Sequence, residues 1–346
     1  MRIGFYNPYF DGLGGGERYT LVLASHWSTS HDVVLFWDDT EIINSAQKRF
    51  GIDLSRVKVV QNIFRGKNVL QKIALSRRYD LIFFLSDGSV PTSFARRNIL
   101  HFQVPFEKVD ANPFKMMRYQ AIVCNSLFTK EHLDERVSKR AQVIYPPVPV
   151  DNRTPRKKER LILSVGRFSE AKKQNVLIDT FREGHARGVL HGWKLVLAGG
   201  LLDTDNAYFN ALKLKATKLP VMFLPNISER QLIPIYGRAS TYWHATGFGE
   251  TDPKRMEHFG ISTVEAMAAG CVPIVYDGGG LPEIIEHDSS GLLWNSIDEL
   301  LTLTAGIIND QPRAKIIARQ AKERSHVFNE KAFCSAFDSL LLQISF

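Results

Sequence analysis

The sequence contains little cysteine, with only three residues in 346. Cys124, Cys271 and Cys334 are far apart and odd in number, which excludes a disulfide framework and a paired CxxC metal site. Long apolar runs are also missing, because no stretch reaches the roughly 18–20 residues that a membrane-spanning helix needs. The sequence enters an apolar strand without the pattern of a signal peptide. We therefore expect a cytoplasmic protein in a reducing compartment, which leaves peripheral contact with the inner face of a membrane open.

The composition is otherwise that of an ordinary globular protein. Hydrophobic residues make up 44% and charged residues 23%, and the aromatic content of 11% argues against disorder. At roughly 150 residues per domain, the length predicts about two domains. The net charge is +8, of which residues 1–150 carry +6 and residues 151–346 carry +2. This balance predicts an anionic partner without choosing among a nucleotide, a nucleic acid and a membrane surface.

Short apolar runs alternate with longer amphipathic segments, such as 17–27 and 129–135. In the first half, the apolar runs predict strands at residues 2–6, 33–37, 57–61, 81–85, 99–102, 121–125 and 142–145. In the second half, they predict strands at residues 161–165, 194–198, 221–224, 241–244 and 272–276. Uninterrupted apolar runs are typical of parallel strands buried on both faces. The alternation therefore predicts an α/β fold with doubly wound sheets.

A break in this pattern predicts the domain boundary. Residues 145–149 (YPPVP) are too rich in proline for a helix or a central strand, and the polar run 152–160 is typical of an exposed linker. We predict domains at 1–150 and 151–328, with a ligand cleft between them at the C-terminal ends of their strands. A C-terminal helix is predicted at about 329–346, for which packing back on the first domain is one option.

The first motif of interest is glycine-rich. Residues 12–18 (GLGGGER) follow the first predicted strand and open a helix, where glycines let the backbone approach a ligand and free N–H groups can bind an anion. The spacing differs from G-x-G-x-x-G, which argues against a dehydrogenase. A plain tight turn remains the alternative.

The second motif, GRFSEAKKQ at residues 166–174, follows the first predicted strand of the second domain. Arg167 offers a bidentate fork, and Lys172 and Lys173 offer point charges, so the motif could clamp a diphosphate. A solvated basic loop is the alternative.

The third motif, EHFGISTVE at residues 257–265, has a glutamate at each end and a glycine that can start a helix. Glu257 is expected in the loop before the helix and Glu265 about one turn inside it. Carboxylates in these positions can accept hydrogen bonds from sugar or ribose hydroxyls, beside N–H groups that favour anions. Two ordinary surface carboxylates are the alternative.

Taken in order with EAMAAG and the later DGGGLPEII, these motifs resemble the retaining GT-B glycosyltransferases of the mannosyltransferase and glycogen-synthase type. The resemblance covers nearly the whole sequence. It implies two facing Rossmann-like domains with a cleft between them, the first binding the acceptor and the second the nucleotide-sugar donor. It further implies transfer of a hexose with retention to a glycan or lipid-linked saccharide, first of all mannose from GDP-mannose. A UDP-hexose donor is the alternative, and no cofactor is implied.

The resemblance also assigns residues. Arg167 and one of Lys172 and Lys173 would hold the donor diphosphate. Glu265 would bind the ribose hydroxyls, and Glu257 would face the hydroxyls of the donor sugar.

Further positions are implied by the same resemblance. The backbone beside the donor sugar would be that of Phe259, Gly260 and Ile261. The first-domain backbone that approaches the diphosphate or the acceptor would be that of Gly14, Gly15 and Gly16. His101 would lie near the transferred sugar, although a core histidine fits its apolar setting equally well. No protein nucleophile is assigned.

Other features have simpler interpretations. Asp203-Thr204-Asp205 is a DxD sequence, but it follows a glycine loop in a sequence that resembles a metal-independent fold, so no metal site is predicted. The basic residues do not alternate with aromatics as in nucleic-acid binders, so no nucleic-acid partner is expected. The segment 65–78 is basic and amphipathic, and it could lie on anionic lipid or form an ordinary solvated helix.

Three competing functions remain open from the sequence. Two are enzymes of the same fold, an epimerase and a phosphorylase, of which the phosphorylase would carry a lysine-bound pyridoxal phosphate. The third is a non-catalytic module that binds anions or nucleic acid through the basic first domain.

Overall fold

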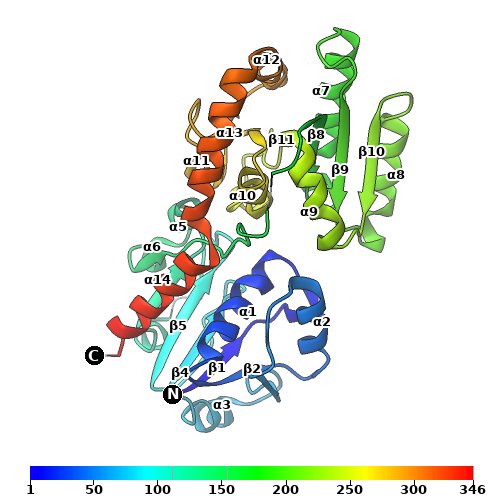
Figure 1. The fold of residues 1–346 in the computed structure, drawn as a ribbon. Coiled ribbons are helices and arrows are strands. Elements are labelled where there is room, and N and C mark those ends of the chain that lie inside the picture. Colours follow the sequence, from blue (N-terminus) through cyan, green and yellow to red (C-terminus); the bar gives the residue numbers. More distant parts are fainter. Residues whose placement is uncertain (111, 154, 346) are drawn as a thin grey trace. The chain divides into compact units, whose positions relative to one another are not determined.

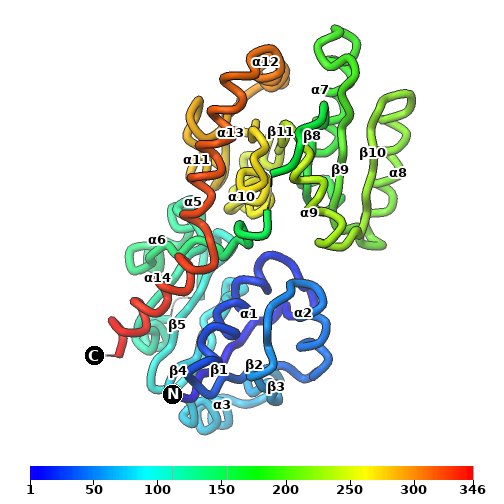
Figure 2. Tube along the Cα trace, in the orientation of Figure 1, coloured from blue at the N-terminus to red at the C-terminus, as the bar shows by residue number. Residues whose placement is uncertain are grey.

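The computed structural model describes residues 1–110, 112–153 and 155–345, and it divides into two compact units (Figure 1). Unit 1 comprises Met1–Pro147 and Glu330–Phe346, and unit 2 comprises Val148–Asn329. The chain therefore passes from one unit to the other twice. Its last helix, red in Figure 2, belongs to unit 1.

Unit 1 is built on a parallel sheet. Within the described residues it has seven strands in the order β3-β2-β1-β4-β5-β6-β7. Their bounds are β1 (Arg2–Tyr6), β2 (Asp32–Phe36), β3 (Lys58–Val60), β4 (Leu81–Leu85), β5 (Arg97–Phe102), β6 (Ala121–Cys124) and β7 (Ala141–Val143). All five residues of β4 are buried, as expected of a central strand covered on both faces.

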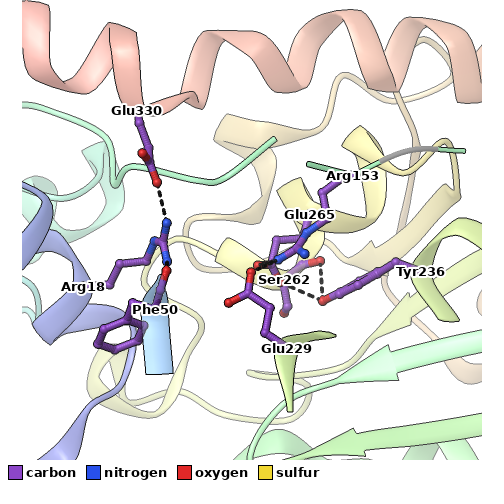
Figure 3. Close-up of polar contacts among 8 residues, drawn as sticks. All are labelled: Arg18, Phe50, Arg153, Glu229, Tyr236, Ser262, Glu265 and Glu330. Carbon is purple, nitrogen blue, oxygen red and sulfur yellow. Dashed lines mark hydrogen bonds and ion pairs between the residues drawn. The ribbon is translucent and has the colours of Figure 1, made fainter. Parts of the chain in front are cut away.

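The α-helices of unit 1 are α1 (Gly15–Ser28), α2 (Ile42–Phe50), α3 (Val69–Ser76), α4 (Pro113–Met116), α5 (Leu127–Glu131), α6 (Glu135–Ser138) and α14 (Glu330–Gln343). Helix α14 completes the core, because its Phe333, Phe337, Leu340 and Leu341 are buried in the same cluster as β1 and α1. Arg18 of α1 pairs with Glu330 at the start of α14 and donates to the Phe50 carbonyl at 3.3 Å (Figure 3). The predicted C-terminal helix is thus present, and Phe346 lies outside the described residues.

Unit 2 repeats the architecture with a second parallel sheet. Within the described residues it has six strands in the order β10-β9-β8-β11-β12-β13. Their bounds are β8 (Glu159–Val165), β9 (Lys194–Gly199), β10 (Val221–Pro225), β11 (Ala239–His244), β12 (Val272–Tyr276) and β13 (Leu292–Trp294). The α-helices are α7 (Gln174–Ala186), α8 (Asn206–Lys215), α9 (Glu229–Arg238), α10 (Ile261–Ala268), α11 (Leu281–Ile284), α12 (Ile297–Asn309) and α13 (Gln311–Ser325).

The strand order confirms the doubly wound α/β prediction and locates where a ligand can bind. In each sheet the order reverses once, between β1 and β4 in unit 1 and between β8 and β11 in unit 2. Doubly wound sheets bind ligands beyond the carboxyl ends of the strands at such a reversal. In unit 2 these ends lead into the loops that begin at Gly166 and Ala245.

The local structure differs from the sequence analysis at three places. The amphipathic segment 129–135 spans parts of two short helices, α5 and α6, because the buried carboxylate of Asp134 accepts from the backbone N–H of Val109 and that of Arg136, both at 3.1 Å. Strand β13 was not predicted, although its three residues are all apolar.

The third difference concerns the run 152–160, which was expected to be an exposed linker and is exposed at most of its described residues, with Arg153 as the buried exception. Arg153 within it is buried, Lys158 donates to the Ala269 carbonyl at 2.9 Å, and β8 already begins at Glu159. Thr154 of this run lies outside the described residues. The polar composition therefore reflects paired charges rather than exposure alone.

Candidate active site

The loop after β8 carries the predicted diphosphate clamp. It runs close to the end of β9, where a Cβ on Gly199 would lie 2.0 Å from the Gly166 carbonyl oxygen. The Arg167 side chain is exposed and has no hydrogen bond or ion pair within the described residues, while its carbonyl accepts from Gln174 at 2.9 Å. Arg167 is thus available to an anionic ligand.

The two neighbouring lysines point to different carboxylates. Lys172 ends the short 3-10 helix Glu170–Lys172, and Lys173 adopts the left-handed conformation with φ of 54° before α7. Lys172 Nζ donates to Glu257 Oε2 at 2.7 Å, and Lys173 Nζ donates to Glu250 Oε1 at 2.5 Å. The backbone turn at Lys173 therefore separates two adjacent charges that the sequence could not tell apart.

Glu257 is the centre of a polar cluster. Its Oε2 lies 3.1 Å from Nε2 of His244, the last residue of β11, and that nitrogen lies 3.2 Å from the Thr246 hydroxyl. Burial disfavours the charged carboxylate, but the positive charge of Lys172 and the His244 hydrogen bond outweigh it and hold the pKa of Glu257 well below its ordinary value. Glu257 is therefore a carboxylate that accepts hydrogen bonds, not an acid that donates a proton.

The backbone around Glu257 is held by the glycines of the DGGG sequence. The Gly280 N–H donates to the Glu257 carbonyl at 2.7 Å. Gly279 has φ of 63°, and a Cβ there would lie 2.2 Å from the same carbonyl oxygen. Only glycine fits this contact, which explains why DGGG accompanies the glutamate motif.

A second carboxylate cluster involves Glu250, which the sequence prediction missed. Its two oxygens pair with Lys173 at 2.5 Å and with Arg255 Nε at 3.1 Å. The hydrogen bond from Lys173 lowers the pKa of Glu250 in spite of an opposing desolvation effect. This cluster ties the 246–255 loop to the N-terminus of α7.

Helix α10 places the other predicted glutamate. Gly260 caps the helix with φ of 111°, and Phe259 before it is buried against Phe328, with ring centroids 5.4 Å apart. Glu265 lies one turn inside the helix. Its Oε1 accepts from Arg153 at 2.5 Å, and its Oε2 accepts from the Tyr236 hydroxyl at 2.9 Å (Figure 3). Lys172 and Glu257 are in direct contact, whereas within the described part of the chain Arg167 and Glu265 form no hydrogen bond or ion pair with either.

Comparison with known proteins decides the family. The family model described as "Glycosyl transferases group 1" matches residues 151–324, just over half of the chain. The protein belongs to this family. The match covers the whole polar site described above, from Arg153 to α10.

Full-length similarity extends the match to unit 1. A GDP-Man:Man(3)GlcNAc(2)-PP-Dol alpha-1,2-mannosyltransferase of Dictyostelium discoideum is 27% identical over 97% of this chain and 83% of its own. The enzyme of that name from Homo sapiens is 26% identical over 96% of this chain and 85% of its own. A crystal structure of Anabaena Alr3699/HepE in complex with UDP superposes with a TM-score of 0.76 at 18% identity, covering 99% of this chain and 100% of the other. The fold is that of the GT-B glycosyltransferases, as predicted.

The glycine-rich loop of this glycosyltransferase lies at the N-terminus of α1. Gly14 and Gly15 are exposed, and the Gly14 N–H is already taken by Glu17 Oε2 at 2.7 Å. Gly16 packs against the side-chain amide of Gln103, since a Cβ there would lie 2.2 Å from its Oε1 unless that side chain moved. The prediction that these three glycines approach a ligand stays a prediction.

His101 lies in the core of unit 1. Its side chain is fully buried on β5, stacked on the Tyr19 ring at 4.0 Å, with Nδ1 at 3.2 Å from the Val123 carbonyl. Burial lowers its pKa to about 3, so the ring is neutral. The burial favours the alternative of a core histidine, and the position near the transferred sugar stays a prediction.

The DxD sequence forms an exposed 3-10 turn at Asp203–Asp205. In the part of the chain that the structure describes, no group of three or more His, Cys, Asp or Glu side chains is arranged to hold a metal ion. Cys124 and Cys271 are buried, and all three cysteines are free.

Proposed function

We propose that this glycosyltransferase transfers mannose from GDP-mannose, with retention, to a lipid-linked glycan. The observation that carries the proposal is the contact of Lys172 with Glu257. It lies in unit 2, which the family model matches, where the strand order of the sheet reverses between β8 and β11. It pairs a cation that can bind a diphosphate with a carboxylate that can bind sugar hydroxyls. The choice of mannose rests on the two mannosyltransferase relatives that match nearly the whole chain.

In the proposed reaction, Arg167 and Lys172 neutralise the diphosphate as the bond to the sugar breaks. Charge stabilisation of this kind is often the largest single contribution to catalysis. Lys172 is the better choice of the two lysines, because only its ammonium group lies beside Glu257, while Lys173 is held by Glu250. Glu257 accepts from the donor sugar hydroxyls, beside the backbone of residues 259–261, and Glu265 accepts from the ribose.

Activity measurements with a donor panel test this proposal. Purified protein is assayed with GDP-mannose, UDP-glucose and UDP-galactose and a lipid-linked oligosaccharide acceptor. We expect turnover with GDP-mannose, an α-linked product, and losses of at least about 100-fold in Glu257→Gln and Arg167→Ala. Arg238→Met serves as the control, since Arg238 is partly exposed and pairs with Glu159 outside the site. Turnover with a UDP-sugar but not with GDP-mannose would show that the proposed donor is wrong. Full activity in both site variants would reject the residue assignment.

We further propose that unit 1 binds an anionic membrane surface through α3. No described helix has both the length and the apolarity needed to cross a bilayer. Val69 and Leu70 of α3 are 58% and 77% exposed, in a segment that also carries Lys67, Lys72 and Arg77. Exposed apolar groups among basic ones favour the interface of an anionic bilayer.

Vesicle co-sedimentation tests the attachment. We expect binding to vesicles of phosphatidylglycerol and phosphatidylcholine, loss of binding in pure phosphatidylcholine, and a marked reduction in Leu70→Glu. Leu214→Glu in unit 2, where Leu214 is equally exposed, is the matched control. Equal binding of the two variants would exclude α3 as the attachment point.

A further inference from the structure

Arg153 is buried where the sequence predicts exposure. It comes from the segment that leads into β8, and only 2% of its surface is exposed. Its Nη2 donates to Glu265 Oε1 at 2.5 Å and to Glu229 Oε1 at 3.0 Å, as Figure 3 shows. Burying an arginine is costly unless it is paired, so its partners indicate why it is there.

The contacts fix both oxygens of Glu265. Arg153 holds Oε1, and the Tyr236 hydroxyl holds Oε2 at 2.9 Å. A carboxylate has about four acceptor positions, so two remain for a ligand. The Glu265 side chain is still 15% exposed, which leaves these positions within reach.

The surroundings keep the donors of this cluster protonated. Desolvation opposes the charge of Arg153, but the nearby carboxylate of Glu265 outweighs it and raises the pKa of the guanidinium. Burial raises the pKa of Tyr236 well above its ordinary value, so its hydroxyl stays a donor. The guanidinium also lies 5.5 Å above the Tyr236 ring, a favourable cation–π distance.

Stability alone is a poor explanation for this arrangement. Nε and Nη1 of Arg153 are buried and have no hydrogen-bond partner within the described residues. Each unsatisfied buried donor is unfavourable, whereas an arginine selected for stability would use more of its N–H groups. Instead, Nη2 of Arg153 donates to both Glu229 and Glu265. This arrangement indicates that Arg153 serves to orient the Glu265 carboxylate.

We propose that Arg153 is a positioning residue that holds the Glu265 carboxylate in the orientation in which it accepts from the ribose of the donor nucleotide. Arg153 does not touch the donor in this proposal and acts only through Glu265, with Tyr236 as the second support. The inference rests on the proposed function, which assigns the ribose to Glu265.

The experiment compares nucleotides with and without ribose hydroxyls. Calorimetry gives the dissociation constants of GDP and 2′,3′-dideoxy-GDP, and their ratio is the ribose penalty. We expect a penalty of about 10- to 100-fold in the wild type, as for hydrogen bonds to a charged group. It should fall to within about 3-fold of unity in Glu265→Gln and in Arg153→Met. Arg153→Lys, which keeps the charge, should retain part of it. The dissociation constant of inorganic pyrophosphate itself should be unchanged in Arg153→Met.

A second variant covers the case in which Arg153→Met does not fold. Tyr236→Phe removes one hydrogen bond to Glu265 and keeps the ring, so the protein should fold with a reduced penalty. Arg238→Met is the control on the same helix, α9, and should keep the full penalty.

The outcomes separate the two proposals. The positioning proposal alone is overturned if the ribose penalty is lost in Glu265→Gln but intact in folded Arg153→Met. If Arg153→Met does not fold, an intact penalty in Tyr236→Phe has the same consequence. No penalty in the wild type overturns the ribose assignment of Glu265 and the inference with it. If the donor panel selects UDP, the same series is run with UDP and 2′,3′-dideoxy-UDP.

Discussion

At the residue scale, two adjacent lysines form ion pairs with two different carboxylates. Glu257 takes Lys172, and Glu250 takes Lys173. The division follows from the left-handed backbone of Lys173, which turns its side chain away from that of its neighbour. Such a turn cannot be predicted from the letters KK.

The division predicts unequal losses when either lysine is replaced. Lys172→Met should reduce kcat/KM for GDP-mannose by about 100- to 1000-fold, because it removes positive charge from the diphosphate. Lys173→Met should reduce it by no more than about 10-fold, because it loosens only the 246–255 loop. Steady-state kinetics decide this, and a larger loss in Lys173→Met would reverse the assignment.

His101 predicts a pH dependence of stability. The pKa of His101 is about 3 in the folded protein and 6.5 in a model peptide. Between these pH values the imidazole is protonated in the unfolded chain but not in the folded protein. The contribution of neutral His101 to the free energy of unfolding is complete above pH 6.5. It is lost as the pH falls toward 3, by up to about 1.4 kcal/mol per pH unit.

His101→Phe should flatten the acid side of the unfolding curve measured in urea at successive pH values. Phenylalanine keeps the stacking on Tyr19 and removes the titration. Identical slopes in the two proteins would show that His101 is not neutral in the folded state.

At the scale of elements, the loop from 257 to 260 depends on the loop from 277 to 280. The Gly279 contact with the Glu257 carbonyl leaves no room for a side chain. We expect Gly279→Ala to displace Glu257 and to lower kcat/KM for GDP-mannose by at least about 10-fold, a size typical of misplaced catalytic groups.

Gly188→Ala is the matched control for this prediction. Gly188 has φ of 76°, close to the 63° of Gly279, and a Cβ there would meet nothing within 4 Å. It therefore adds the same backbone strain, about 1–2 kcal/mol, without the clash. Similar kinetics in both variants would show that strain rather than displacement of Glu257 matters.

The elements also show what the sequence allows one to predict. The buried strands were found because parallel strands are continuously apolar. The Lys172–Glu257 contact was not predicted, because the sequence left the choice between Lys172 and Lys173 open. Arg153 and Glu250 were missed, since each lies in a polar stretch whose composition indicates solvent. Their burial depends on partners far away in the sequence, such as Glu265 for Arg153.

At the scale of the whole molecule, we propose that positive side chains supply what a metal ion supplies in other nucleotide-dependent enzymes. Arg167 and Lys172 lie where the diphosphate is proposed to bind. We therefore predict that transfer from GDP-mannose proceeds at an unchanged rate in excess EDTA, measured after dialysis against chelator. A rate restored only by Mg²⁺ or Mn²⁺ would contradict this charge arrangement.

The return of α14 to unit 1 has a consequence for synthesis. Unit 2 is one continuous stretch, Val148–Asn329, whereas unit 1 needs Phe333 and Phe337 from the last seventeen residues to fill its core. On the ribosome, unit 2 can therefore fold while the first 147 residues still wait for their final helix. The unit that is made first is completed last, and a chain released early would leave the core around Tyr19 and Trp27 open to chaperones and proteases.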